Sequence, residues 1–171
     1  GIELIGDGSV GADLEVLSMA FDALDRSELN SYSLEIGHAG FFNAILDDMD
    51  IDASQKAEIC SLTESKNFAA LSDLLSSIGD TVQTRVLNTL PRLFGGREVL
   101  KQAKQLYSSE KSDAALDYLG NIYQKLCEMG HGDNVLIDLG LVNRTNYYTG
   151  VIFRGYAEGS GVSVLSGGRY D

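Results

Sequence analysis

Residues 139–171 read LGLVNRTNYYTGVIFRGYAEGSGVSVLSGGRYD, and this pattern predicts a β-hairpin. From Tyr147 to Tyr156, β-branched and aromatic residues alternate with small ones; the glycine-rich run 157–161 interrupts them, and Val162 to Leu165 is a second short apolar run. Both ends of the hairpin carry polar or aromatic residues beside glycines, which let a backbone come close to a ligand. Because tyrosine offers a flat apolar face and a hydroxyl, we expect a small polar ligand to bind there.

Three further segments are predicted to be strands of the same sheet. Residues 1–6 (GIELIG) form a short predicted strand that places Glu3 among apolar neighbours, and residues 32–38 alternate apolar and polar side chains. His38, at the end of the second segment, is expected to be a hydrogen-bonded structural histidine. Residues 135–139 are almost uninterruptedly apolar, which predicts a strand just before the hairpin.

The middle of the chain is predicted to be helical. Residues 12–26 have a helical period, and from 41 to 129 leucine, isoleucine and alanine recur at three- and four-residue intervals between turn-like breaks. Pro91, the only proline, is expected to kink or end the helix predicted over 82–94.

The order of these elements predicts an α+β fold, in which an antiparallel sheet is interrupted by an inserted helical subdomain. We expect a core sheet at 1–40 and 133–171 and a helical insertion at 41–132. The chain begins inside a strand-like pattern and stops at Asp171 without a terminating element, so we expect both ends to be cut from a longer protein.

Composition limits the classes of partner. The 171 residues are 44% hydrophobic, enough to bury a core, and a net charge of −12 would repel a phosphate backbone, which argues against nucleic-acid binding. No apolar run approaches the ~20 residues of a membrane span. Cys60 and Cys127 fit neither a zinc pattern nor a disulfide framework, so we expect buried free thiols in a reducing cytoplasm.

The candidate site residues suit recognition better than catalysis. The sequence has no nucleophilic serine or cysteine motif, and we expect no cofactor and no metal. The remaining cluster comprises Glu3, Tyr147, Tyr148 and the run Gly167, Gly168, Arg169 and Tyr170. Because a carboxylate attracts an ammonium group while hydroxyls and backbone amides bind a neutral or acidic end, this cluster outlines an amino-acid site. The alternative is that the tyrosines only fill a sheet face.

The motifs NYYTGVIFRGY and LSGGRYD, with GIELIG and LEIGHAGFF before them, resemble two related families. One is the catalytic core of class II histidyl-tRNA synthetases. The closer one is their paralogue family, the regulatory subunits of ATP phosphoribosyltransferase in histidine biosynthesis. The similarity covers 1–40 and 135–171, and it implies the antiparallel sheet of the class II aminoacyl-tRNA synthetase core.

This sequence differs from the synthetase pattern at the residues with which the synthetases activate histidine. Their segment corresponding to 141–150 usually reads LVRGLDYYTG, and its arginine contacts the histidine carboxylate and the ATP phosphate. Asn143 stands at that position here. Arg144 follows, but neighbouring side chains of an extended chain point to opposite faces, and Asn146 replaces the usual aspartate. Because a cation on the developing phosphate charge is a large part of this catalysis, we expect a regulatory paralogue rather than an enzyme.

The resemblance also implies residue roles. Glu3 would face the amino or imidazole nitrogen of histidine, Tyr148 would line the imidazole pocket, and the loop from Gly167 to Tyr170 would close over it; Tyr147 and Gly168 are carried over with them.

A function follows from the same resemblance. It implies an allosteric subunit that binds histidine and, in a hetero-oligomer with the short-form ATP phosphoribosyltransferase catalytic subunit, is required for its activity and feedback control. The full-length protein would be a cytoplasmic homodimer. A divergent histidyl-tRNA synthetase and a stand-alone amino-acid sensor remain alternatives.

Overall fold

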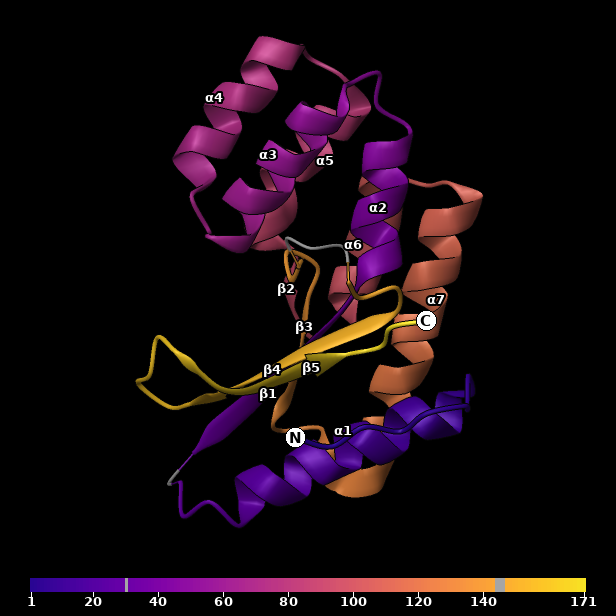
Figure 1. Cartoon of the computed structure of the whole chain (residues 1–171), viewed down its shortest axis with the longest axis vertical. Helices are drawn as coiled ribbons and strands as arrows, with labels where there is room; N and C mark the ends of the chain where they lie inside the picture. Colours follow the sequence, from indigo (N-terminus) through magenta and orange to yellow (C-terminus); the bar gives the residue numbers. More distant parts are fainter. Residues whose placement is uncertain (30, 144–146) are drawn as a thin grey trace.

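The computed structural model describes residues 1–29, 31–143 and 147–171. A five-stranded sheet lies in the middle of the molecule, with helices below it and above it in Figure 1. The strand order is β2-β3-β1-β4-β5. The strands are β1 (Tyr32–His38), β2 (Phe94–Gly95), β3 (Val135–Asp138), β4 (Val151–Ala157) and β5 (Ser163–Gly168). Segregated helices beside a largely antiparallel sheet confirm the predicted α+β class.

One pairing of the sheet differs from the predicted antiparallel arrangement. β4 is antiparallel to both β1 and β5, and β2 is antiparallel to β3, but β1 and β3 run parallel, with Ile36 opposite Ile137. The reason is the connection between them. The chain between them, residues 39–134, contains helices and the short strand β2 and returns to the end of the sheet where β1 begins, so β3 runs in the same direction as β1.

The predicted hairpin is confirmed, and the predicted strand over residues 1–6 is wrong. β4 and β5 form the hairpin, although β5 extends to Gly168, so that Gly167 and Gly168 lie in a strand and not in a loop. Residues 1–9 are irregular and run beside α1 (Figure 1). Within the described sheet no strand pairs with them, and a left-handed Gly6 (φ 87°) together with the Ser9 N–H···Asp7 bond of 2.8 Å turns this segment before α1.

Polar side chains cap the N-termini of most of the helices. The Ser9 hydroxyl accepts a hydrogen bond from the Ala12 N–H, and Asp52 and Gln55 form a reciprocal capping box. Pro91 lies in a 3₁₀ turn directly after α5, so it ends that helix as predicted. The helices are α1 (Val10–Asp25), α2 (Ala39–Asp47), α3 (Ala53–Glu64), α4 (Phe68–Ile78), α5 (Val82–Thr89), α6 (Glu98–Leu106) and α7 (Glu110–Leu126), and a π-helical turn, Cys127–His131, follows α7. None of the helices in the described ranges has the length and apolar composition to cross a bilayer.

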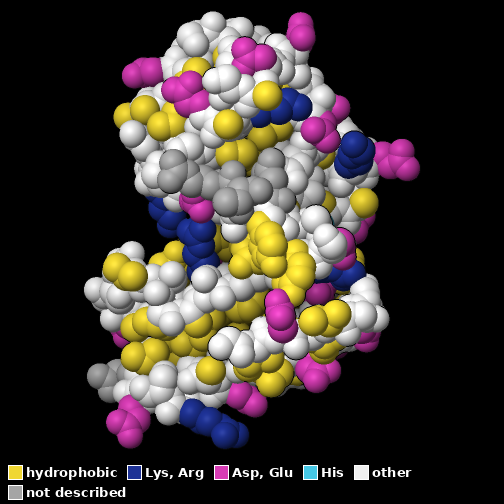
Figure 2. Space-filling model, viewed as in Figure 1, with side chains coloured by type: hydrophobic (Ala, Val, Ile, Leu, Met, Phe, Trp, Pro, Cys, Tyr) yellow, Lys and Arg dark blue, Asp and Glu magenta, His cyan; other side chains and the backbone are white. Residues whose placement is uncertain are grey.

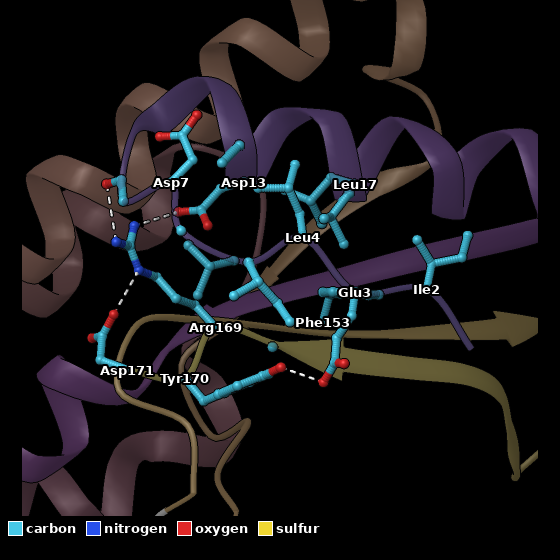
Figure 3. Close-up of a pocket in the computed structure, with 17 residues that line it drawn as sticks. Ile2, Glu3, Leu4, Asp7, Asp13, Leu17, Phe153, Arg169, Tyr170 and Asp171 are labelled. Carbon is cyan, nitrogen blue, oxygen red and sulfur yellow. Dashed lines mark hydrogen bonds and ion pairs between the residues drawn. The ribbon is translucent and has the colours of Figure 1, made fainter.

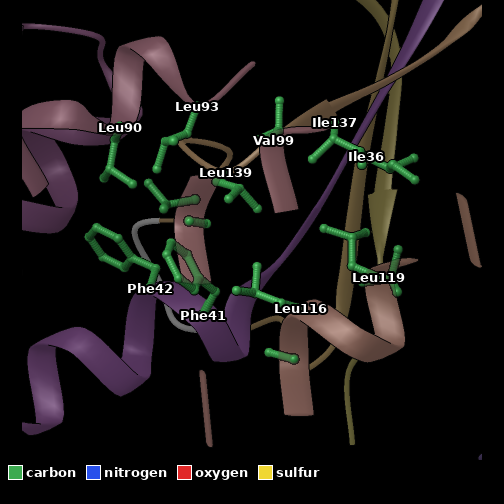
Figure 4. Packing of buried hydrophobic residues seen from close by; sticks show 14 of the residues in the cluster. Ile36, Phe41, Phe42, Leu90, Leu93, Val99, Leu116, Leu119, Ile137 and Leu139 are labelled. Atoms are coloured by element: carbon green, nitrogen blue, oxygen red, sulfur yellow. The ribbon is translucent and has the colours of Figure 1, made fainter. Parts of the chain in front are cut away.

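One hydrophobic core joins the sheet to the helices. Ile36 pairs with Phe153 in the β1–β4 register, Leu34 lies two positions earlier on the same face of β1, and all three are buried together with α1 and α7 side chains. Figure 4 shows Ile36 and Ile137 beside Leu119 in this core. The same cluster includes residues of α3 and α4, and β2 pairs with β3, so the segment predicted as an insertion shares its core with the sheet. The division into 1–40 with 133–171 and 41–132 stays a prediction.

Candidate ligand-binding site

Four of the predicted site residues form a continuous chain of contacts. The Tyr170 hydroxyl donates a hydrogen bond to Glu3 Oε1 (Figure 3). The Tyr147 ring stacks on Tyr170 with centroids 4.9 Å apart, and it meets Tyr148 edge-on at 5.4 Å. The hydrogen bond to Glu3 raises the pKa of Tyr170 to about 12, because a phenolate would lie beside a carboxylate. At neutral pH the Tyr170 hydroxyl therefore keeps its proton and donates a hydrogen bond to Glu3.

The two predicted glycines contact aromatic rings on opposite faces of β5. A Cβ on Gly168 would lie 2.7 Å from the Tyr148 ring, and a Cβ on Gly167 would lie 2.4 Å from the Phe153 ring. Both positions therefore need glycine, because an aromatic ring lies flat against the strand. The structure brings Gly168 to the tyrosines, whereas Gly167 contacts the core side and does not join them.

A cavity of about 380 Å³ opens beside the Glu3–Tyr170 pair. Segment 2–8, α1 and the ends of β4 and β5 enclose it (Figure 3). Its apolar lining includes Leu4, Val16, Leu17, Val151 and Phe153, and its polar lining consists of Glu3, Asp7, Asp13, Arg169, Tyr170 and Asp171. The size suits a small molecule, and four carboxylates against one guanidinium favour a ligand that carries a positive group.

The outer face of this region is apolar as well. In the space-filling view, hydrophobic side chains gather over the sheet and the N-terminal segment in the lower half of the molecule (Figure 2). Exposed large apolar side chains from these elements and the residues beside them are Ile2, Ile5, Tyr147, Val162, Val164 and Tyr170.

Arg169 has a defined set of partners that the sequence did not reveal. Its Nη2 donates to the Gly8 carbonyl at 2.9 Å, its Nη1 lies 3.5 Å from Asp13 Oδ2, and its Nε lies 3.5 Å from Asp171. Tyr118 donates to the same Asp13 oxygen at 2.6 Å. One signal in the sequence points to Asp13: it lies one turn before the buried Leu17 on α1, which places its carboxylate on the inward-facing side of the helix.

His38 has the structural role predicted for it. Its Nδ1 accepts the Gly40 N–H at 3.0 Å and so caps α2, while its ring meets Tyr118 edge-on at 5.6 Å. Burial lowers the pKa of His38 to about 4, so the imidazole is neutral at physiological pH.

A second polar cluster lies on the opposite face of the sheet, and the sequence analysis missed it. Glu35 and Asp138 are both buried, with relative exposures of 9% and 7%, and Arg154 lies opposite Glu35 in the β1–β4 register. Burial and then the charge of Asp138 raise the pKa of Glu35 to about 7, and burial also raises the pKa of Asp138. The sequence contains a signal for this cluster, because Glu35 is a charged residue at an alternate position of a central strand.

Asn143, the position of the synthetase arginine, is half-buried and lines a small hollow with Tyr148 and Ile152. A guanidinium lies next to this segment: Arg154 Nη2 donates to the Val142 carbonyl at 3.2 Å. Arg154 also forms an ion pair with Glu64 at 3.9 Å and lies opposite Glu35, so its charge is on the face of the acidic cluster and away from Glu3 and Tyr170. The predictions for Arg144 and Asn146 lie outside the described residues.

The family model described as histidyl-tRNA synthetase matches residues 1–171. The chain belongs to the histidyl-tRNA synthetase family. A family member from Clostridium acetobutylicum, named ATP phosphoribosyltransferase regulatory subunit, is 41% identical over 100% of this chain. The resemblance read from the motifs is thus confirmed.

Solved structures agree with the family assignment. A crystal structure of an ATP phosphoribosyltransferase regulatory subunit/histidyl-tRNA synthetase from Bacillus halodurans has a TM-score of 0.89 and 36% identity, and the match covers 98% of this chain and 45% of that one. In the ATP phosphoribosyl transferase (HisG:HisZ) complex from Thermotoga maritima, a chain with a TM-score of 0.75 and 24% identity shares the fold, with 96% of this chain and 57% of that chain covered. The synthetase-like class II core is therefore confirmed.

The chain is shorter than these family members. It spans 43% of the Clostridium acetobutylicum relative and 45% of the Bacillus halodurans chain.

Proposed function

We propose that this chain is the histidine-binding part of an ATP phosphoribosyltransferase regulatory subunit and that it does not catalyse amino-acid activation. The observation that carries the proposal is the meeting of the Glu3 carboxylate and the Tyr170 hydroxyl at an apolar-lined cavity. Asn143, in place of the arginine that the synthetases use, supports the non-catalytic role. The names of the relatives support the regulatory role.

The chemistry of the cavity matches the groups of histidine. A charged hydrogen bond from the α-ammonium group or a ring N–H to Glu3 is of the strong, ion-assisted kind. The apolar lining and the face of Tyr170 accommodate a flat ring, and Tyr170 can rotate its hydroxyl from Glu3 to the ligand. The excess of carboxylates around the cavity discriminates against ligands without a cationic group.

The proposed role in the cell is allosteric. The full-length protein, as a cytoplasmic homodimer, joins the short-form catalytic subunit in a hetero-oligomer, is required for its activity and transmits end-product inhibition by histidine. The relatives' names support the regulatory role, and the Thermotoga maritima complex supports an assembly with the catalytic subunit. Such control requires that histidine bind two states of the complex with different affinity.

Isothermal titration with histidine tests the binding step. We expect saturable binding, and Glu3→Gln should weaken it by about 1.5–3 kcal/mol because a charged hydrogen bond becomes a neutral one. Glu15→Gln, an exposed position on α1, is the matched control and should leave the affinity unchanged. Absence of binding at millimolar histidine would remove the proposal, and an unchanged affinity in Glu3→Gln would place the ligand elsewhere.

A divergent histidyl-tRNA synthetase is the second candidate, because the matching family model carries that description. It predicts histidine-dependent exchange of pyrophosphate into ATP, whereas the regulatory proposal predicts none. Co-purification with a short-form phosphoribosyltransferase distinguishes the regulatory subunit from a stand-alone amino-acid sensor.

A further inference from the structure

Segment 2–8 forms one wall of the cavity but does not belong to the sheet. Among the described residues, two side chains join it to other elements by hydrogen bonds. Tyr170 donates to Glu3 near one end of the segment, and Arg169 donates to the Gly8 carbonyl at the other end. Two consecutive residues therefore hold both ends of this wall (Figure 3).

Two glycines leave the space that the Arg169 side chain occupies. A Cβ on Gly8 would lie 2.9 Å from Arg169 Nη2, and a Cβ on Gly150 would lie 2.8 Å from Arg169 Cδ. The guanidinium and its stem thus lie directly against backbone at both places. The Arg169 backbone is fixed too, because the Arg169 carbonyl accepts the Thr149 N–H at 2.8 Å and its N–H donates to the Val151 carbonyl at 2.7 Å.

Asp13 and Tyr118 hold the guanidinium from the helix side. The Asp13 side chain is 11% exposed, and its Oδ2 receives both the Tyr118 hydroxyl at 2.6 Å and Arg169 Nη1 at 3.5 Å. Burial, followed by the hydrogen bond to Asp13, raises the pKa of Tyr118 to about 12, so the hydroxyl stays a donor. These contacts connect α1, α7, the end of β5 and segment 2–8.

We propose that Asp13, Tyr118 and Arg169 form a clasp that positions segment 2–8 and Tyr170 around the ligand cavity. The three are positioning residues: Arg169 holds Gly8 directly and fixes the backbone from which Tyr170 reaches Glu3, while Asp13 and Tyr118 fix Arg169. The clasp therefore sets the geometry of the cavity wall before a ligand arrives. Its expected effect on histidine affinity rests on the proposed function; its effect on segment 2–8 does not.

Hydrogen–deuterium exchange of the ligand-free protein tests the clasp independently of histidine. Tyr118→Phe removes only a hydroxyl, and Tyr123→Phe, on the same helix but outside the clasp, is the matched control. We expect faster exchange in residues 2–8 and 169–171 for Tyr118→Phe and Arg169→Ala, with unchanged exchange in the control. Equal exchange in all three variants and the wild type would overturn the clasp.

Titration with histidine gives the second measurement. Tyr118→Phe should weaken binding by about threefold to tenfold, since one hydrogen bond to a charged group is lost and only part of its effect reaches the ligand. Arg169→Ala should weaken it more, and free guanidinium ion at low millimolar concentration should restore part of the affinity, whereas ammonium should not. A merely structural loss of packing would not be rescued in this way.

The two measurements separate the two proposals. If the wild-type protein binds no histidine but the exchange changes occur, the clasp stands and the proposed function fails. If the wild-type protein binds histidine and the variants alter neither exchange nor affinity, the clasp fails and the proposed function stands.

Discussion

Replacing Glu35 with glutamine should remove the contribution of this carboxyl to a pH dependence of stability that originates on the second face of the sheet. Glu35 is 9% exposed, and in the described part of the chain its Oε2 has no hydrogen-bond partner. Burial and the neighbouring Asp138 raise its pKa from 4.5 to about 7, while Lys66 and Arg154 only partly offset these effects. The protonated carboxyl is therefore the form that suits the folded state.

The sign and the size of the effect follow from the linkage between proton binding and folding. The folded-state pKa lies above the unfolded one, so the stabilisation is complete below the unfolded pKa and is lost as the pH rises through the folded pKa. With pKa values of 4.5 and about 7, the free energy of unfolding should fall by about 2.5 kcal/mol between about pH 5 and about pH 8.5. The raised pKa of Asp138 acts in the same direction.

Urea unfolding followed by circular dichroism across this pH range measures the effect. Glu35→Gln keeps the size of the side chain and cannot ionise. As the pH rises, the wild type should therefore lose about 2.5 kcal/mol of unfolding free energy relative to the variant. Glu15→Gln on the exposed face of α1 should run parallel to the wild type. A constant difference between wild type and Glu35→Gln at every pH would refute the reasoning.

Two further predictions concern the framework of the site. Gly168→Ala places a Cβ 2.7 Å from the Tyr148 ring and should lower the unfolding free energy by about 1–3 kcal/mol. A Cβ at Gly161 meets nothing within 4 Å, so the control Gly161→Ala should lower it far less. Equal losses in the two variants would contradict the packing argument. Asp52→Ala removes the N-cap of α3 and should cost about 1 kcal/mol by urea unfolding, with the neighbouring Asp50→Ala as control; a wild-type midpoint would mean that this cap does not contribute.

The candidate site was partly predictable because its residues cluster in short motifs. Glu3, Tyr147, Tyr148 and Tyr170 were predicted to share one site, and the structure brings them into contact. Gly167 was predicted with them but packs on the core, because β5 extends past the predicted end of the strand and alternation turns this position to the other face. Binding of histidine by these residues stays a proposal.

The sequence by itself determined the helices, the hairpin and the family, because periodicity, turn residues and motifs act over short separations. Only the tertiary structure decided the contacts between distant segments. Arg169 meets Asp13 across 156 positions, and Glu35 meets Asp138 across neighbouring strands. It also decided that β1 and β3 run parallel and that residues 1–6 form no strand in the described sheet, since pairing depends on which edges become neighbours. Burial, which shifts the pKa values of Glu35 and His38, exists only once those segments have packed.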